Sequence, residues 1–299
     1  MRLHFSRRTA VLGLSIVLAG CSASHSSSNP SAARSARSPS NVVFFDDFSG
    51  PSLDRTKWTP RVSGPIYNDE QQAYIDDTAT VSIVSGVAAQ GASNGALKIR
   101  ARHRPGFVTA EGKRFDFVSG RLDTQGKLEF MHGSAAARMR LPSGHGFWPA
   151  FWILGTGSWP ATGEIDVMEN VGEPSWVSAA VHGPGYSGEE ALVRHDAFPA
   201  GQDASGWHVY AVDWSSDAMV FRVDDREIYR VTKAMVTPRG AWSFDNQKYL
   251  IVNLAIGGVY PRKENHWTGT YVGLPDSTLR SIKADSSAVL VDWVRVTQN

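Results

Sequence analysis

Short β-rich runs recur from residue 41 to the end of the 299-residue chain, and they constrain its fold more than any other feature. Turn residues such as Gly, Pro, Asp and Ser separate the runs, and long helical periodicity is absent. Many short strands between turns are typical of a two-sheet sandwich or a jelly roll. The sequence therefore predicts one all-β domain over residues 41–299. The runs include ALKIRARH, GKLEFMH, AAARMRL, HVYAVDW, MVFRVDD, YLIVNLAI and VLVDWVRV.

One strand-like run carries three carboxylates within six residues, in the segment GEIDVMEN. Side chains two apart on a strand share a face, so Glu164 and Asp166 are expected to project together. At strict alternation Glu169 would lie on the opposite face. It can join the other two only if the strand contains one extra residue, a β-bulge, near Val167 or Met168. The parity of the segment therefore predicts a bulge, a feature that is common beside active sites.

Three carboxylates on one face repel one another, so they cannot all be ionised at neutral pH, and the most desolvated one should keep its proton. Unequal protonation is what acid–base catalysis needs. Retaining glycoside hydrolysis uses two carboxyls about 5 to 5.5 Å apart, one as nucleophile and one as acid and then base. On a regular strand, five steps of about 3.3 Å would separate Glu164 and Glu169 by roughly 16 Å. The bulge, strand twist and two long side chains must close that gap.

Two other interpretations of the triplet stay open. The carboxylates could form a solvated acidic strand face, or they could bind calcium or magnesium through their hard oxygen atoms. Neither explains the aromatic residues that precede them in GFWPAFWILGTGSWP. Trp148 and Trp152 are four residues apart and share a strand face, which suits stacking on a sugar ring, although such a pair alone is more often part of a core.

From residue 41 to 299 the chain resembles the family-16 glycoside hydrolases, and within them the bacterial laminarinase-like endo-β-1,3-glucanases. The resemblance implies a concanavalin A-like β-jelly-roll sandwich with a concave substrate cleft. It also implies that Glu164 is the nucleophile, Asp166 the assisting carboxylate and Glu169 the general acid/base, with no cofactor for catalysis. The segments that carry it are FFDDFSGPSLDRTKW, NDEQQAY, SGRLDTQGKLEF, RMRLPSGHGFWPAFWILG, GEIDVMEN, VHGPGYSG, WHVYAVDWSSDAMVFRVDD and VDWVRV.

The same resemblance implies a set of sugar-binding residues around the triplet. Some of them match positions on the donor side of the cleft, and Asn253 is a candidate for the acceptor side. His182 is expected on a strand beside the catalytic one, although a single His is about as often a satisfied buried group. The donor-side residues are Asn68, Glu70 and Arg121, and the remaining members of the set are Trp148, Trp152, Trp159, His182 and Asn253.

Several positions depart from the family pattern and leave the triplet intact. Ala136 and Asp213 stand where relatives often carry Glu, and Val259-Tyr260 replaces a familiar Trp after LAIGG. These departures concern the acceptor subsites, and so the preferred polysaccharide.

Many relatives hold a structural calcium on the convex side, away from the cleft. The matching positions here are Asp47, Gly95 and Asp292, where Asp47 is shorter than the frequent Glu. Oxygen ligands this far apart in sequence suit a calcium ion that joins the two ends of the domain.

The first 40 residues differ from the rest, because they hold five Arg, no acidic residue and a Ser-rich tract. The pair Arg7-Arg8, the apolar run TAVLGLSIVLAG and Cys21 are typical of an export signal, and the run is too short for a membrane span. The segment LAGC resembles a bacterial lipobox, although a Cys can stand there by chance. Residues 1–21 are thus predicted to be a lipoprotein-type signal peptide with Cys21 lipidated, and residues 22–40 a disordered tether.

Without these 40 residues the chain has 25 basic and 29 acidic residues, a net charge of about −4. Nucleic-acid binding would call for a basic face, whereas a neutral glycan suits this balance. The sequence therefore predicts a monomeric, exported retaining hydrolase that cleaves internal linkages of β-1,3-glucan and meets the membrane only through Cys21. The alternatives are the same chemistry on mixed-linkage β-glucan, galactan or another cell-wall glycan, a transglycosylase, and a glycan-binding surface protein without activity.

Overall fold

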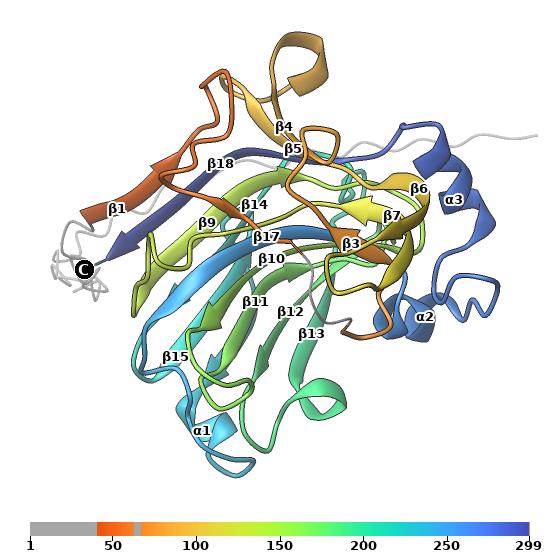
Figure 1. The fold of residues 1–299 in the computed structure, drawn as a ribbon. Helices are drawn as coiled ribbons and strands as arrows, with labels where there is room; N and C mark the ends of the chain where they lie inside the picture. Colours follow the sequence, from red (N-terminus) through yellow and green to blue (C-terminus); the bar gives the residue numbers. More distant parts are fainter. Residues whose placement is uncertain (1–40, 63–66, 299) are drawn as a thin grey trace, which may run out of the picture. The chain divides into compact units, whose positions relative to one another are not determined.

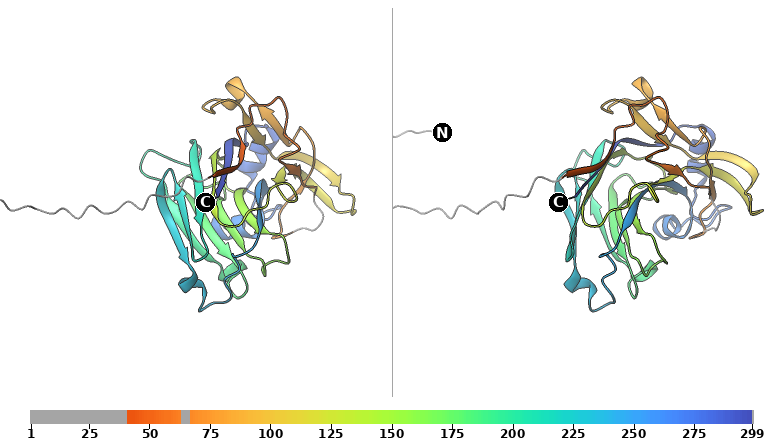
Figure 2. Two further views of the ribbon diagram at one scale, coloured as in Figure 1. Left: turned by 90° about the vertical axis from the view of Figure 1, so that its left-hand side faces the viewer. Right: turned by 60° about the vertical axis from the view of Figure 1, so that its left-hand side comes forward.

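Two antiparallel sheets packed face to face form the domain in the computed structural model, which describes residues 41–62 and 67–298 (Figure 1). Sheet A has eight strands in the order β16-β15-β14-β9-β18-β5-β4, with β1 also paired to β18. Sheet B has seven strands in the order β13-β12-β11-β10-β17-β8-β2. The side views in Figure 2 show the two layers. The predicted all-β jelly-roll sandwich is confirmed.

The strands are short, as the sequence predicts, and the helices are few among the described residues. Sheet A contains β1 (Asn41–Asp46), β4 (Val81–Val84), β5 (Ala96–Ile99), β9 (Gly133–Arg140), β14 (His208–Trp214), β15 (Ala218–Val223), β16 (Arg226–Thr232) and β18 (Val289–Gln298). Sheet B contains β2 (Thr59–Pro60), β8 (Arg121–Asp123), β10 (Phe147–Gly155), β11 (Glu164–Glu169), β12 (Trp176–His182), β13 (Leu192–Ala197) and β17 (Lys248–Ile256). A third sheet contains β3 (Gln72–Tyr74), β6 (Arg102–Val108) and β7 (Arg114–Ser119), and the helical segments are η1 (Gly86–Ala89), η2 (Gly188–Glu190), α1 (Lys233–Val236), α2 (Val259–Asn265) and α3 (Asp276–Lys283).

Alternation along the strands builds one main core between the two sheets. On β14, Tyr210, Val212 and Trp214 are buried and belong to this core, while the residues between them are less buried. On β10, Phe151 and Ile153 point into the same core from the opposite sheet. Burying one such side chain contributes about 1.5–3 kcal/mol, so the shared core fixes which face of sheet B points outward. That outward face carries the residues of interest.

The small third sheet and the helices α2 and α3 lie beside one end of the sandwich (Figure 1). The segment before β3 packs against the start of α2, where the backbone N–H of Val259 donates to the carbonyl oxygen of Asn68 at 2.8 Å. Gly258 allows this approach, since it has a φ of 98° and an added Cβ would lie 2.6 Å from the same oxygen. The third sheet is thereby joined to sheet B close to the residues predicted to bind sugar.

The predicted signal peptide at residues 1–21, the lipidated Cys21 and the tether at residues 22–40 lie outside the described residues and stay predictions. Within residues 41–62 and 67–298, the helices are all too short or too polar to cross a bilayer.

The three positions matched to calcium ligands lie near one another on the side of sheet A that faces away from the main core. Asp292 is buried, and its carboxylate accepts hydrogen bonds from the backbone N–H of Ser93 at 2.7 Å and from the Ser93 hydroxyl at 3.0 Å. Asp47 accepts a hydrogen bond from the Asn94 amide at 3.0 Å. Gly95 is the next residue, and a Cβ there would come within 2.3 Å of the Phe48 carbonyl oxygen.

A guanidinium group already neutralises Asp292. Nη1 of Arg138 lies 2.5 Å from Asp292 Oδ2 and donates also to the Gly91 carbonyl oxygen at 2.9 Å. The same guanidinium lies 5.0 Å from the ring centre of Trp207, a cation–π distance. Asp292 thus uses three of its roughly four acceptor positions, and the Arg138 guanidinium beside it would repel a calcium ion. The residues present do not fit the calcium site that the resemblance implies.

We expect removal of divalent cations to leave the thermal stability of the protein unchanged, because Arg138 supplies the positive charge next to Asp292. The melting temperature can be compared in excess EDTA and in excess calcium chloride. In Arg138→Met, Asp292 is left buried without a cation, which should lower the free energy of unfolding by about 3 kcal/mol and make the melting temperature rise with calcium. A fall in the melting temperature of the unchanged protein in EDTA would contradict this expectation.

Candidate active site

The three carboxylates lie on β11, and a bulge in this strand turns Glu169 to the same side as the other two. Two adjacent residues of β10 pair with Asp166 and Met168, so Val167 is the extra residue. The register with β12 shifts over the same stretch, between Asp166 and Glu169. Val167 and Met168 are both buried in the main core, as neighbouring residues of a bulge can be. The bulge predicted from parity is confirmed.

Burial raises the pKa of all three carboxyls. For Glu164, burial and then the charge of Asp166 raise the pKa to about 8. Burial and the charge of Glu169 raise the pKa of Asp166 well above its ordinary value. Burial also raises the pKa of Glu169, opposed by a hydrogen bond from Trp148 Nε1 to its Oε1 at 2.9 Å. The triplet therefore retains a proton at neutral pH and titrates as a coupled group, as acid–base chemistry requires.

His182 lies opposite Glu164 on the neighbouring strand β12, as predicted. Its Nε2 is 3.1 Å from Asp166 Oδ2 and 3.9 Å from Glu164 Oε1. Its Nδ1 accepts a hydrogen bond from the backbone N–H of Gly188, so in the neutral ring the proton is on Nε2 and points to the carboxylates. Asp166 Oδ2 has no hydrogen-bond partner among the described residues, so its contact with His182 is electrostatic.

Trp148 and Trp152 lie on the carboxylate side of β10, as the spacing predicts, and fixed partners hold both indoles. Trp148 donates to Glu169, and Trp152 donates through Nε1 to Asn253 Oδ1 at 2.7 Å. The guanidinium of Arg121 lies 4.8 Å from the ring centre of Trp152. The two rings therefore form a pre-set aromatic surface on either side of the triplet.

A buried polar network extends from Trp152 to Glu70. The Asn253 amide donates to the Tyr74 hydroxyl at 3.1 Å, and this hydroxyl donates to Glu70 Oε2 at 3.3 Å. Burial raises the pKa of Glu70, while hydrogen bonds, including one from Asn68, and the charge of Arg121 lower it. Nε of Arg121 is a buried donor without a hydrogen-bond partner among the described residues. The three residues predicted for the donor side are thus brought together.

Asn253 lies with residues that the resemblance assigns to the donor side. The resemblance put it on the acceptor side, but the structure places it directly opposite Arg121 on β8 and within the network of Tyr74 and Glu70. The reason is the strand order of sheet B, in which β17 lies between β10 and β8. Asn253 therefore belongs with the group predicted for the donor side.

Trp159 lies apart from the other tryptophans, on the loop between β10 and β11. Its side chain is half exposed, with a relative exposure of 52%, and its ring centre is 6.3 Å from that of His182. An exposed indole next to the carboxylates is available to a ligand, which agrees with its predicted place in the sugar-binding set.

Several residues on the other side of Glu169 were not predicted. The Tyr260 ring meets Trp148 edge to face at 5.4 Å, and its hydroxyl lies 3.1 Å from Ser178 Oγ and 3.2 Å from His195 Nε2. The His195 ring in turn stacks on Trp176 at 4.2 Å. The one sequence signal was the departure at Val259-Tyr260, which marked an unusual position without indicating its partners. Tyr74 was likewise missed, although it lies in the quoted segment NDEQQAY.

A metal-binding arrangement is the remaining alternative for the triplet. Donor atoms of Glu164, Asp166 and His182 lie within 4.8 Å of one another, whereas Glu169 is outside this group. Calcium and magnesium prefer sites made only of oxygen atoms, so an imidazole in the set favours a transition metal instead. The donor atoms that lie close enough to share a metal ion are therefore those of Glu164, Asp166 and His182, and not those of the three carboxylates.

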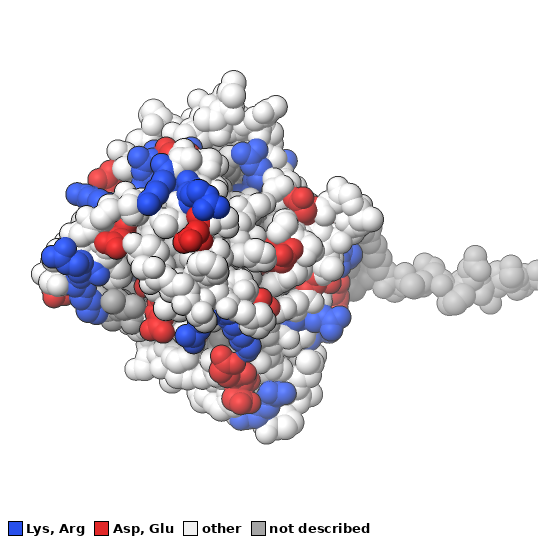
Figure 3. All heavy atoms as spheres, turned by 90° about the vertical axis from the view of Figure 1, so that its right-hand side faces the viewer, with Lys and Arg blue, Asp and Glu red and all other residues white. Residues whose placement is uncertain are grey.

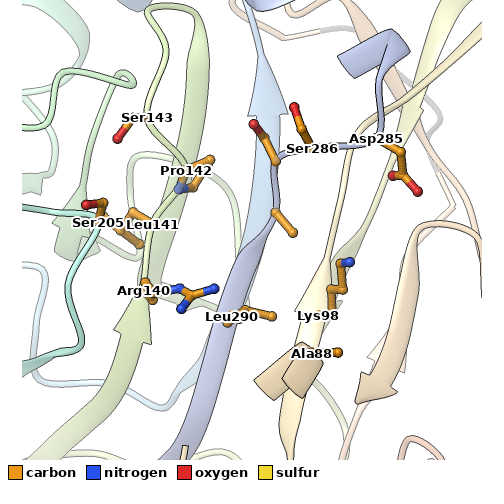
Figure 4. Close-up of a pocket in the computed structure, with 12 residues that line it drawn as sticks. Ala88, Lys98, Arg140, Leu141, Pro142, Ser143, Ser205, Asp285, Ser286 and Leu290 are labelled. Atoms are coloured by element: carbon orange, nitrogen blue, oxygen red, sulfur yellow. The ribbon is translucent and has the colours of Figure 1, made fainter. Parts of the chain in front are cut away.

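A hollow of about 410 Å³ on sheet A offers a different chemistry (Figure 4). Lys98 and Arg140 line it, together with serines and Asp285. The exposed Asp285 forms ion pairs with Arg100 and Arg102, which hold its pKa below its ordinary value although partial desolvation opposes them. The lining contains neither a second carboxyl nor an aromatic platform, so the bulged strand β11 is the better candidate for catalysis.

The molecular face in Figure 3 carries Lys and Arg side chains next to Asp and Glu side chains. The basic groups form no continuous patch on this face, in keeping with the near balance of charges in the sequence.

Known proteins share both the sequence and the fold. Residues 75–273 match the sequence model of the family "Glycosyl hydrolases family 16". A β-glucanase of Rhodothermus marinus is 34% identical over 97% of this chain and 94% of its own length. Glucan endo-1,3-β-glucosidase A1 of Niallia circulans is 33% identical over 73% of this chain, which spans only 34% of that longer protein.

Among solved structures, the endo-β-1,3-glucanase of Pyrococcus furiosus is similar with a TM-score of 0.74 and 34% identity. The match covers 87% of this chain and 94% of that one. The family match over residues 75–273, a relative that matches nearly the whole chain and the observed sandwich agree, and the chain belongs to family 16 of the glycoside hydrolases.

Proposed function

We propose that this hydrolase cleaves internal β-1,3 linkages of a laminarin-like glucan by double displacement with retention. The observation that carries the proposal is the bulge at Val167, which brings Glu169 to the same side of β11 as Glu164. Retaining glycosidases need two enzyme carboxyls that lie close enough together to act on the same glycosidic bond. The names of the relatives in Rhodothermus, Niallia and Pyrococcus support a β-glucan as the substrate.

In the proposed mechanism, Glu169 gives its proton to the leaving glycosidic oxygen while Glu164 attacks the anomeric carbon and forms a glycosyl-enzyme intermediate. Burial favours the protonated form of Glu169, as an acid requires. When the proton has left, the N–H of Trp148 stabilises the carboxylate that remains. Glu169 then takes a proton from water, and this water releases the sugar from Glu164.

Asp166 and His182 adjust the charge around Glu164. The buried Asp166 lies between the two reacting carboxyls in sequence, and it shares a hydrogen bond with Glu164. A proton on Asp166 would let Glu164 ionise for attack, while the Nε2–H of His182 favours negative charge on both. This division of protons lets one site hold an anionic nucleophile and a neutral acid.

Aromatic surfaces and polar groups would bind the polysaccharide on both sides of the cleavage point. Trp152 with Glu70, Asn68 and Arg121 is proposed for the donor side, and Trp148 with Tyr260 for the acceptor side. Indole faces suit the apolar faces of glucose rings.

We expect laminarin to be cut faster than lichenan or agarose, and to give a ladder of oligosaccharides rather than a single small product. Chromatography of timed digests measures both properties, and NMR of the first product reports the anomer. Faster release from lichenan or agarose would move the assignment to a mixed-linkage glucan or a galactan. Products longer than the starting oligosaccharide would indicate a transglycosylase.

Replacement Glu164→Gln should abolish hydrolysis of laminarin while the protein stays folded, because the amide cannot attack the anomeric carbon. Reducing-end release and circular dichroism measure the two properties.

Glu169→Gln should still accept glucosides whose leaving group needs no proton, such as dinitrophenyl laminaribioside. Glu111→Gln, at an exposed turn, is the control. Near-normal hydrolysis by Glu164→Gln would refute the assignment, and binding without cleavage by the unchanged protein would favour a glycan-binding role.

The raised pKa of Glu164 predicts how stability depends on pH. The ordinary pKa is 4.5 and that in the folded protein about 8, so the folded state binds more protons between these values. The stability of the unchanged protein should therefore fall as pH rises through this window, by at most about 1.4 kcal/mol for each pH unit. Glu164→Gln cannot ionise at this position, so the difference between its melting temperature and that of the unchanged protein should become more positive as pH rises. If this difference does not change with pH, or if Glu111→Gln shows the same change, the result would argue against the raised pKa of Glu164.

A further inference from the structure

Lys248, the first residue of β17, is fully buried at the end of sheet B, and the proposed mechanism does not use it. Its Nζ donates to the Asn246 side-chain oxygen at 2.8 Å and to the Ser243 carbonyl oxygen at 3.1 Å. It also donates to the carbonyl oxygen of Thr162 and approaches that of Gly163 at 3.5 Å. Lysine is among the residues that are almost never fully buried unless paired, so this arrangement calls for an explanation.

The oxygen atoms and aromatic rings around Nζ stabilise its ammonium form, whereas desolvation disfavours that form. Four oxygen atoms surround a group that has three N–H donors, and the ring centres of Phe244 and Trp214 lie 5.5 Å and 5.8 Å away. Desolvation lowers the pKa of Lys248 to about 7, and the charge of Asp245 raises it. Lys248 thus gathers backbone carbonyls that would otherwise be buried without a donor.

These carbonyls belong to the segment that leads directly into the catalytic strand. Thr162 and Gly163 immediately precede Glu164, which is the first residue of β11. Gly163 has a φ of 72°, and an added Cβ would lie 2.4 Å from the Ser243 carbonyl oxygen, so the two segments are pressed together. The backbone before Glu164 is therefore bound to the turn at residues 243–246 through a single ammonium group.

The same loop also carries Trp159 at the rim of the candidate site. Its backbone turns back on itself through hydrogen bonds from Thr162 N to the Ser158 oxygen and from Gly163 N to the Pro160 oxygen. Movement at Thr162 would therefore be passed to both Glu164 and Trp159. Lys248 itself points into the sandwich, since its Nζ contacts core rings, and it does not reach the sugar-binding face.

We propose that Lys248 is a positioning residue for Glu164, which fixes the backbone at the start of β11 so that the carboxylate faces the anomeric carbon. The proposal rests on the role of Glu164 as nucleophile given under the proposed function. Displacement of a reacting group by about 1 Å can lower a rate by about 10²-fold. A residue without any contact to substrate can therefore control the chemical step.

The test replaces Lys248 by Met, which keeps the length of the side chain and removes the ammonium. A 2-deoxy-2-fluoro laminaribiosyl fluoride traps the glycosyl-enzyme intermediate, and mass spectrometry locates the label and gives its rate of formation. We expect the unchanged protein to be labelled on Glu164, and Lys248→Met to be labelled about 10- to 100-fold more slowly. The kcat for laminarin should fall in parallel, while KM changes less than threefold.

Arg138→Met is the matched control for lost stability. It breaks a buried polar contact on the outer side of sheet A, whereas the loop at residues 156–163 joins two strands of sheet B, and it should keep the labelling rate of the parent. All rates are measured well below the melting temperature of each variant. If Lys248→Met and Arg138→Met lose stability alike and label alike, Lys248 is merely structural and the proposal is overturned.

Asn246→Ala provides a second variant in case Lys248→Met does not fold. It removes one acceptor of Nζ at a partly buried turn and should slow labelling by a few-fold in the same direction. An unchanged labelling rate in this variant would also overturn the proposal. Failure of the unchanged protein to label on Glu164 would instead refute the proposed function, so the two outcomes are distinguishable.

Discussion

The extra residue at Val167 is the constraint on which the rest of the candidate site depends. A strand in a sandwich is held by its apolar face, and that face sets the direction of every other side chain. By placing Val167 and Met168 side by side in the core, β11 reverses its alternation without losing buried surface. The strand can then keep Glu164, Asp166 and Glu169 on one face while both sheets stay fully packed. Chemistry and core packing are compatible here because of one inserted residue.

Gathering three carboxyls on a buried face costs free energy, and the surrounding residues reduce that cost in different ways. Trp148 donates to Glu169, His182 lies beside Asp166 and Glu164, and the remaining charge is removed by protonation. Functional sites often carry such unfavourable burial, which the fold compensates elsewhere. Here the compensation comes from the large shared core of sheets A and B, to which nearly every strand contributes. The fold serves as a rigid support, and the reactivity comes from the few polar groups on it.

The sequence was sufficient to predict those elements that depend only on the order of residues within one strand or turn. Alternation and turn residues indicate the strands, and the parity of Glu164 and Glu169 indicates the bulge, because both follow from the period of a single strand. The contacts of Tyr74 and Tyr260 could not be predicted, since they join segments whose proximity depends on strand order. The burial of Lys248 was invisible for the same reason, as its oxygen partners come from two separate loops. The predicted calcium ligands show a different limit: resemblance matches Asp292 by position, whereas the guanidinium beside it, Arg138, comes from another strand.

The network from Glu70 to Trp152 bears on the entropy of sugar binding. The indole of Trp152 is held by Asn253 at its edge and by Arg121 against its face, and Asn253 is itself held by Tyr74. A flexible aromatic side chain would lose rotamer freedom on contact with a sugar, which amounts to about 0.5–1.5 kcal/mol for each side chain that becomes ordered. In this protein that ordering took place during folding. With the sugar-binding role proposed for Trp152, the stability of the sandwich would contribute to affinity, because the free protein already holds the surface on which a sugar ring would rest.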